Sequence, residues 1–346
     1  MQNKGIKLDE NINPEAMGKL VEVFLRFVEI RPWEWMSDAD LFAVQIPGEE
    51  EIFYACVLGN GGIIYGLALY PGNAGLRYYL LQNLINSKGY LSVFENYGPC
   101  FLLSLGDREE LLPEERKAYR EMGYKFRGRQ AWPVFRSYHP TYHEWKMTAD
   151  EMRLATTLVE QSILLALHCK KHRRKWNNQA KNYKIPCCTA GCNLEEMENS
   201  ISWIPLPEML QMAEVIPVDE ILIKKLKNEV PQYEEAWEFD WFYSPFPIQE
   251  SKKHVPRRPM ILVICDHTSG LMLDFEMLYH EEADIFQFLV KAIQKLKRRP
   301  QAIIVSDPFK ALSLYKLGPA LDCKILIAPH MMIDDFKYTL LEMDSI

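Results

Sequence analysis

The feature that most constrains the fold is an alternation of short apolar runs and amphipathic segments in the last third of the chain. Met260–Cys265 and Ala302–Val305 are continuous apolar runs, which is typical of strands buried on both faces. Between them, Glu282–Arg298 repeats apolar residues at helical spacing,. A second helical segment, Lys310–Leu317, leads to another strand-like run, Lys324–Ala328. This order predicts a C-terminal α/β domain in which these strands share one mixed sheet.

One further strand of that sheet is expected immediately after the first apolar run. Leu271–Leu278 follows Cys265 after a short turn that contains Ser269 and Gly270. Such a short connection allows only antiparallel pairing, because parallel strands need a long crossover. The sequence therefore predicts an antiparallel pair here, followed by right-handed crossovers that place both helices against the sheet.

The first part of the chain has the pattern of an α+β domain. Pro14–Glu29 carries apolar residues at helical spacing, with Asn13 before it as a plausible N-cap,. Ile52–Leu58 and Ile63–Tyr70 are rich in β-branched and aromatic residues, and a glycine-containing turn separates them. Because the turn leads into a second strand and not into a helix, it indicates a hairpin and not a phosphate-binding loop.

A long helix and a basic tract are expected to connect the two halves. Thr148 and Glu151 form a capping box at the start of a helical pattern that extends to Lys175,. From His168 to Lys184 there are seven Lys or Arg residues and no acidic residue. This change of composition predicts three parts: an N-terminal α+β domain (1–147), a helix with a basic, Cys-containing connector (148–200), and a C-terminal α/β domain (201–346).

Composition narrows the classes of protein to which the chain can belong. The 40 Lys and Arg residues are outnumbered by 47 Asp and Glu residues, so no overall positive charge favours nucleic-acid binding. Eight cysteines in 346 residues are too few for a disulfide-stapled secreted scaffold. The polar start lacks the apolar core of a signal peptide, and no apolar run is long enough to span a bilayer. We therefore expect a cytoplasmic protein without a membrane segment.

Two stretches resemble a known family. The first is Ala131–Pro140, read as AWPVFRSYHP, together with Trp145 and Glu151. The second is the order strand-Asp, Ser-Gly, hairpin, helix, Arg-Pro, strand-Asp over Pro259–Pro329. Together they resemble a two-domain bacterial family that is known only as domains of unknown function. The resemblance implies the architecture and a bacterial setting but no activity. Where that family favours Pro-Trp before the long helix, this chain has Glu144 and Trp145.

The order of elements in the C-terminal half is also similar to part of the ribonuclease H-like core of integrases and transposases. That resemblance implies carboxylates at adjacent strand ends that hold two Mg²⁺ or Mn²⁺ ions. Asp266 and Asp307 each directly follow an apolar strand, so they are the candidate metal ligands and catalytic residues. The alternative is that each aspartate only caps a turn or a helix, since Asp307-Pro308 is a common helix start.

A cluster of Cys and His residues offers a second possible metal site. Cys187, Cys188, Cys192 and His172 lie close together in the sequence, and thiolate and imidazole are suitable zinc ligands. The spacing, however, is not the paired C-x₂-C form of zinc fingers and ribbons. Free thiols in a connector are therefore the alternative interpretation.

The basic tract 170–184 is the candidate surface for a partner. It could contact an acidic protein or a nucleic acid, with Trp176 and Tyr183 as stacking residues, or it could be a solvated helix end. The sequence contains no G-x-S-x-G, H-E-x-x-H or P-loop motif, so it lacks the usual support for those enzyme classes. It predicts a non-catalytic binding or interaction module without a cofactor. The alternative is a divergent, metal-dependent ribonuclease H-like nuclease that uses Asp266 and Asp307.

Overall fold

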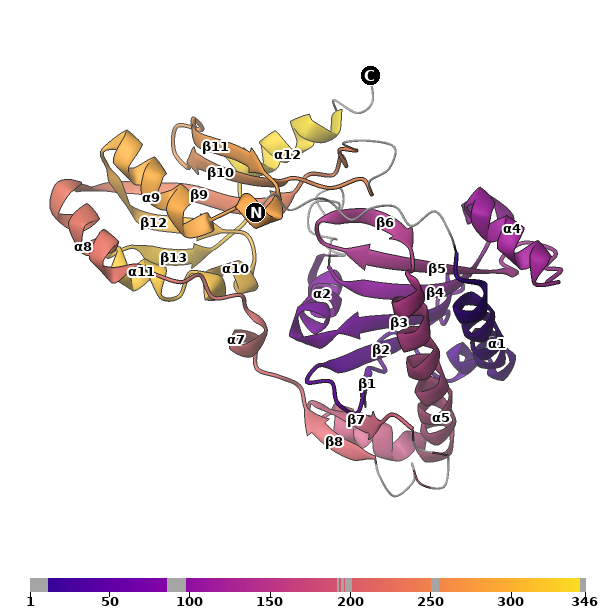
Figure 1. Cartoon of the computed structure of the whole chain (residues 1–346). Coiled ribbons are helices and arrows are strands. Elements are labelled where there is room, and N and C mark those ends of the chain that lie inside the picture. The colour runs from indigo at the N-terminus through magenta and orange to yellow at the C-terminus, as the bar shows by residue number, and fades with distance from the viewer. Residues whose placement is uncertain are drawn as a thin grey trace.

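A computed structural model describes residues 12–85, 98–191, 193, 196, 201–249 and 255–342. Within these residues the chain forms two β-sheets with helices packed against them (Figure 1). The strands of the N-terminal sheet are β1 (Phe42–Gln45), β2 (Ile52–Leu58), β3 (Tyr65–Pro71), β4 (Cys100–Gly106), β5 (Trp132–His139), β6 (Tyr142–Lys146), β7 (Lys184–Thr189) and β8 (Ser202–Pro205). Their spatial order is β6-β5-β4-β3-β2-β1-β7-β8.

Helices cover both faces of the N-terminal sheet. The long helices α1 (Pro14–Ile30) and α5 (Ala149–Ala180) pack together on one face, and α2 (Gly72–Ile85) lies on the other. Residues along β2 alternate between the two cores: Phe53 and Ala55 join the α1/α5 side, and Tyr54 and Cys56 join the α2 side. Period-two alternation of this kind is what a strand buried on both faces requires.

The predicted N-terminal helix and hairpin are confirmed. The side chain of Asn13 accepts from the backbone N–H of Ala16 at 3.0 Å, which caps α1. Strands β2 and β3 pair antiparallel. Gly59 and Gly62 in the turn have φ values of +130° and +73°, a region that side chains rarely tolerate. The turn is therefore a structural hairpin.

The N-terminal sheet takes β7 from the segment expected to be a connector and β8 from the first residues assigned to the C-terminal domain. The capping box is present, because Thr148 and Glu151 exchange side-chain-to-backbone hydrogen bonds at the start of α5. After the helix, β7 pairs parallel to β1, and β8 pairs antiparallel to β7. Ile185 and the apolar residues that follow it in β7 are buried. Their burial on the sheet makes this segment a strand, although the basic tract before it suggested a surface connector.

The C-terminal sheet contains the predicted strands and one that the sequence did not reveal. Its strands are β9 (Gln232–Tyr243), β10 (Met260–Asp266), β11 (Met272–Leu278), β12 (Arg299–Val305) and β13 (Lys324–Ile327), in the order β11-β10-β9-β12-β13. The antiparallel β10/β11 pair is confirmed. The central strand, β9, runs antiparallel to β10 and parallel to β12.

Helices also cover both faces of this second sheet. On one face lie α8 (Glu220–Glu229), α9 (Ile285–Leu296) and α11 (Leu317–Ala320), and on the other lies α12 (Met332–Glu342). The remaining helices are α4 (Pro113–Glu121), α7 (Met209–Met212), α10 (Pro308–Ser313), and the short 3-10 helices η1 (Pro32–Glu34), η3 (Arg108–Glu110) and η4 (His280–Glu282). None of the helices in the described ranges is both long and apolar enough to cross a membrane.

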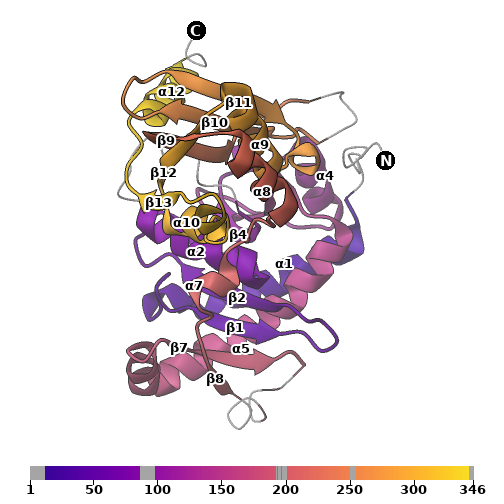
Figure 2. The same ribbon diagram turned by 90° about the vertical axis from the view of Figure 1, so that its left-hand side faces the viewer.

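The two domains contact each other through α7 and α10 (Figure 2). Phe309 of α10 is buried in the same apolar cluster as Tyr54 and Tyr70 of the N-terminal sheet. At a second contact, the backbone N–H of Arg258 donates to the carbonyl of Thr141 at 2.8 Å. The N-terminal core thus extends onto the helix that directly follows β12.

Candidate functional site

The central strand of the C-terminal sheet places two carboxylates inside the domain. Trp237 and Phe239 of β9 pack into the core beneath α8 and α9. Because side chains alternate along a strand, Glu238 and Asp240 face the opposite side, toward α12. Both residues are 0% exposed. Buried carboxylates require charged or hydrogen-bonding partners, and here they have them.

Asp240 is neutralised by lysines from two helices. Lys310 of α10 donates to one carboxylate oxygen, and Lys337 of α12 donates to the other at 2.7 Å. His330 Nδ1 lies 3.5 Å from Asp240 Oδ2. Burial alone would raise the pKa of Asp240, but the charges of Lys310 and Lys337 hold it well below its ordinary value,. Asp240 is therefore an ionised group inside a paired cluster.

Glu238 anchors the start of α12. The backbone N–H groups of Met331, Met332 and Ile333 donate to its carboxylate at 3.0, 2.9 and 3.0 Å. His267 Nδ1 lies 2.7 Å from the same carboxylate. Burial would raise the pKa of Glu238, but the hydrogen bonds from α12 and from His267 lower it overall. An anion at a helix N-terminus is stabilised in this way by the exposed N–H groups and the helix dipole.

The two aspartates identified from the sequence each cap a local structure. Asp266 accepts from Ser269 Oγ at 2.7 Å and from the backbone N–H groups of Ser269 and Thr268. These bonds outweigh burial and lower the pKa of Asp266. Asp307 is the N-cap of α10 and accepts from the backbone N–H groups of Phe309 and Lys310 at 2.8 and 2.9 Å.

The structure does not bring Asp266 and Asp307 together. Asp266 of β10 pairs with Trp237 of β9. On the other edge of β9, Glu238 pairs with Ile304 of β12, which lies three residues before Asp307. The two aspartates are thus offset by about four residues, roughly 13 Å along the strands, and are separated by the width of β9. The carboxylate that lies near Asp307 belongs to a different residue.

That residue is Asp240, which no pattern in the sequence singled out. Lys310 Nζ contacts Asp240 and also lies 3.4 Å from Asp307 Oδ2, so one ammonium bridges the two carboxylates. The signal that could have revealed β9 is the run Trp237–Phe242, in which acidic residues alternate with aromatic ones. Such alternation at a period of two marks a strand.

This cluster is balanced in charge and closed to solvent. Asp240 and Lys337 are 0% and 1% exposed, and the side chains of Lys310 and Asp307 are 13% and 10% exposed. The ammonium groups hold α10 and α12 against the sheet. Within the described ranges, no group of three or more His, Cys, Asp or Glu side chains could hold a metal ion.

The expected zinc ligands are likewise not gathered at one point. Cys187 packs in the apolar cluster on the α2 side of the N-terminal sheet, and Cys188 packs on the α1/α5 side. Adjacent strand residues face opposite ways, so one ion cannot bind both thiols. The ring of His172 lies against that of His168, and Cys192 lies outside the described residues. Burial raises the pKa of Cys187, which disfavours the thiolate that zinc needs.

Residues 170–180 of the basic tract form the C-terminal part of α5, and residues 181–184 lead into β7. The helix is kinked at His172, whose φ and ψ are −121° and 29°. Arg173 donates to Asp40 at 2.7 Å. Trp176 is buried and donates through Nε1 to His168 Nδ1 at 3.1 Å, so it cannot act as a stacking platform. Tyr183, in contrast, is 77% exposed.

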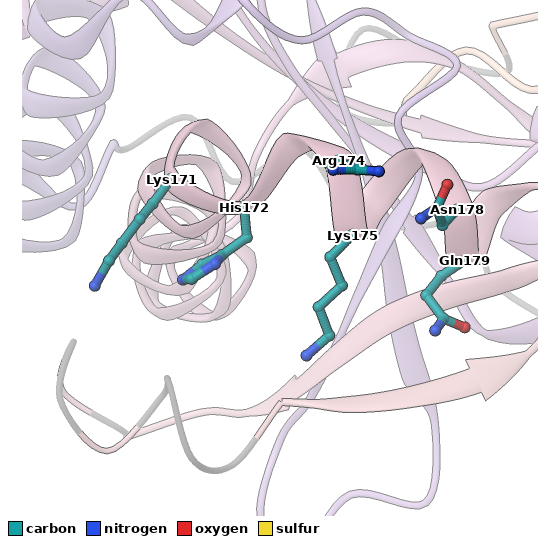
Figure 3. A pocket seen from close by; sticks show the side chains of 6 residues that line it. All are labelled: Lys171, His172, Arg174, Lys175, Asn178 and Gln179. Carbon is teal, nitrogen blue, oxygen red and sulfur yellow. The ribbon is translucent and has the colours of Figure 1, made fainter.

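A shallow hollow lies along this basic surface. It has a volume of about 430 Å³ and is lined by Lys171, His172, Arg174, Lys175, Asn178 and Gln179. Figure 3 shows the side chains of Lys171, His172, Lys175 and Gln179 extending to the same side of the helix. We call these six residues the basic surface.

Comparison with protein-family models gives one match in each half of the chain. Residues 18–186 match the model of a domain of unknown function, DUF7309, and residues 222–341 match that of a second, DUF6930. The two matches together cover most of the chain, with one in each of its two sheet-containing halves. The first match ends inside β7, before the last strand of the N-terminal sheet, and the second begins inside α8 and contains all five strands of the C-terminal sheet. A comparison with curated proteins finds no match.

Proposed function

We propose that the C-terminal DUF6930 domain is a ribonuclease H-like domain without catalytic activity, and that the protein is a binding module. The strand arrangement supports this proposal: three antiparallel strands, β9, β10 and β11, are followed by two strands parallel to β9, with helices after β11, β12 and β13. Two carboxylates on neighbouring strands also support it: Asp240 lies on the central strand, and Asp307 directly follows the adjacent strand, although the resemblance had pointed to Asp266 in place of Asp240.

The observation that carries the proposal is the pairing of these carboxylates with lysines. Two ammonium groups, Lys310 and Lys337, already neutralise Asp240, and Lys310 also lies beside Asp307. A divalent cation brought to this place would meet two fixed positive charges at close range. Lysine thus supplies the charge that a metal supplies in a two-ion nuclease, but it cannot activate water as a metal does.

A thermal-shift measurement with and without millimolar Mn²⁺ tests this proposal. We expect no stabilisation of the wild-type protein, because a ligand raises the melting temperature only if it binds the folded state. Lys310→Ala, which exposes the Asp240–Asp307 pair to a neighbouring cation, should become more responsive to Mn²⁺ than the wild type. A Mn²⁺-dependent shift in the wild type that is lost in Asp307→Asn, together with cleavage of DNA or RNA, would contradict the proposal.

We propose that the binding surface lies on the N-terminal domain. We also propose that the protein is cytoplasmic. The basic surface carries three exposed or half-exposed cations that project from one helix. The described cysteines are buried, and burial raises the pKa of Cys56 to about 12 and that of Cys265 to about 11. Protonated, buried thiols suit a reducing compartment.

A further inference from the structure

We infer that the basic surface of α5 binds the phosphate backbone of a nucleic acid. This inference rests on the proposed function, because it names the partner class of a module that we hold to be non-catalytic. The sequence left open whether an acidic protein or a nucleic acid would bind this tract. The composition of the surface favours the nucleic acid.

In the part of the chain that the structure describes, the side chains lining the hollow are hydrogen-bond donors and include no carboxylate. Arg174 and Lys175 carry fixed positive charges, and the amides of Asn178 and Gln179 add further donors. Arg and Lys charges together with amide side chains are the groups that proteins direct at phosphate oxygens. Lys175 also lies 5.9 Å from the ring of Trp203, which supports its position over β8.

The described lining residues also include none of the apolar side chains that protein interfaces need. Binding energy between proteins is concentrated in buried aromatic and apolar anchors at the centre of a patch. The described residues that line the hollow on α5 are all polar or charged, and the indole of Trp176 is turned inward and bonded to His168, whereas that of Trp203 is half-buried beside Lys175. Contacts at this surface are therefore governed by charge, as contacts to a phosphate backbone are.

The spacing of the donors suits a linear polyanion. After the kink at His172, Arg174 and Lys175 are each followed four residues later by an amide side chain, Asn178 and Gln179. The six residues from Arg174 to Gln179 cover about 9 Å of helix. Because duplex DNA carries one negative charge per ~1.7 Å of axis, several phosphates can face this length of helix.

Two other cations of α5, Lys170 and Arg173, make contacts within the N-terminal domain and are not part of the basic surface. Arg173 is held by Asp40 at 2.7 Å, and Lys170 lies 4.1 Å from the ring centroid of Trp35. These two side chains fix the kinked helix to the N-terminal domain. The cations at 174 and 175 are thus presented on a rigid element and not on a loop.

A second hollow on the N-terminal domain has arginines but fits a polyanion less well. It is lined by Asp107, Arg108, Glu109, Phe126, Arg127, Gly128, Arg129 and Trp132. The carboxylates of Asp107 and Glu109 would repel a phosphate that approached these arginines. Among the described residues that line it, the basic surface has no carboxylate, so it is the one to which we assign the nucleic acid.

Fluorescence anisotropy of the full-length protein with labelled oligonucleotides of about twenty nucleotides tests the assignment. We expect binding of single-stranded or duplex DNA or RNA that weakens as salt rises, since about 0.9 counterions are released per phosphate contact. The double variant Arg174→Glu/Lys175→Glu should bind at least about tenfold more weakly, because it changes two contacts from attractive to repulsive. The milder Arg174→Gln/Lys175→Gln should lie between this variant and the wild type.

A matched control is Lys224→Glu/Lys291→Glu, which changes the net charge equally at exposed positions of the C-terminal domain. It should bind as the wild type does. Circular dichroism melts of all variants establish that they fold. Equal losses in the control and the α5 variant, or no oligonucleotide binding at low salt, would overturn the assignment.

A labelled polyglutamate peptide separates failure of this inference from failure of the proposed function. If the peptide binds through Arg174 and Lys175 and oligonucleotides do not, the nucleic-acid assignment is wrong but the binding module stands. If oligonucleotides bind and are cleaved with Mn²⁺, the assignment of the ligand stands and the non-catalytic function is wrong.

Discussion

Lysine side chains occupy opposite environments in the two domains of this protein. In the C-terminal domain, Lys310 and Lys337 lie beside Asp240, where burial and pairing commit their charges to holding helices against the sheet. On α5, Lys175 and its neighbour Arg174 project from an exposed helix face. The comparison shows that a buried lysine paired with a carboxylate stabilises the fold, whereas an exposed cation without such a pair can bind a ligand.

The largest effect is expected from breaking the buried cluster. Asp240→Asn removes the negative charge between two lysines and leaves Lys337 buried without its ion-pair partner. Removing one member of a buried pair costs about 3–5 kcal/mol, so the free energy of unfolding of the C-terminal domain should fall by that amount in urea titrations. The control is Glu229→Gln, which breaks the exposed pair between Lys225 and Glu229 and should cost less than ~1 kcal/mol. Equal losses in the two variants would show that the cluster is not a structural ion pair.

A smaller effect is expected when acid titrates the same cluster. The pKa values of Glu238 and Asp240 are lowered in the folded state, so these groups contribute stability that is complete above their ordinary unfolded pKa values. That contribution is lost as pH falls below this range. The urea midpoint should therefore not change with pH near neutrality because of these groups, and it should fall steeply in acid. In Glu238→Gln, the urea midpoint should fall less steeply with pH in acid than it does in the wild type. An unchanged slope would mean that the hydrogen bonds from α12 do not depend on the charge of Glu238.

The smallest effect is expected at Asp266, which is outside the cluster. Asp266→Asn keeps one oxygen to accept from Ser269 and Thr268, so its free energy of unfolding should stay within about 0.5 kcal/mol of the wild type. Asp266→Ala removes the acceptor and should cost about 1 kcal/mol. If both variants lost several kcal/mol, or if Asp266→Asn abolished a response to Mn²⁺, Asp266 would have a role beyond capping the turn.

Much of the local structure could be predicted because it depends on short-range chemistry. The caps at Asn13 and Thr148, the hairpin around Gly59 and Gly62, and the strands at Met260 and Ala302 each follow from side-chain types within one element. The sequence could also indicate that Asp307 caps a helix, because Asp-Pro is a local signal for a helix start.

The candidate site could be predicted only in part because its members come from distant segments. Asp240, Lys310 and Lys337 lie on β9, α10 and α12, and no local pattern links them. β9 itself was missed because its acidic residues break the apolar run expected of a strand buried on both faces, and those acids are tolerated only because lysines and helix N–H groups reach them.

The sequence by itself determined the two-domain architecture, the positions of the capped helices and the concentration of positive charge at the end of α5. Only the tertiary structure decided that β7 and β8 continue the first sheet, that Cys187 and Cys188 face opposite cores, and that Asp307 lies near Asp240 and not near Asp266. The reason is physical. Caps and turns are satisfied by neighbours in the chain, whereas strand order and ion pairing are set by which distant surfaces must be buried together.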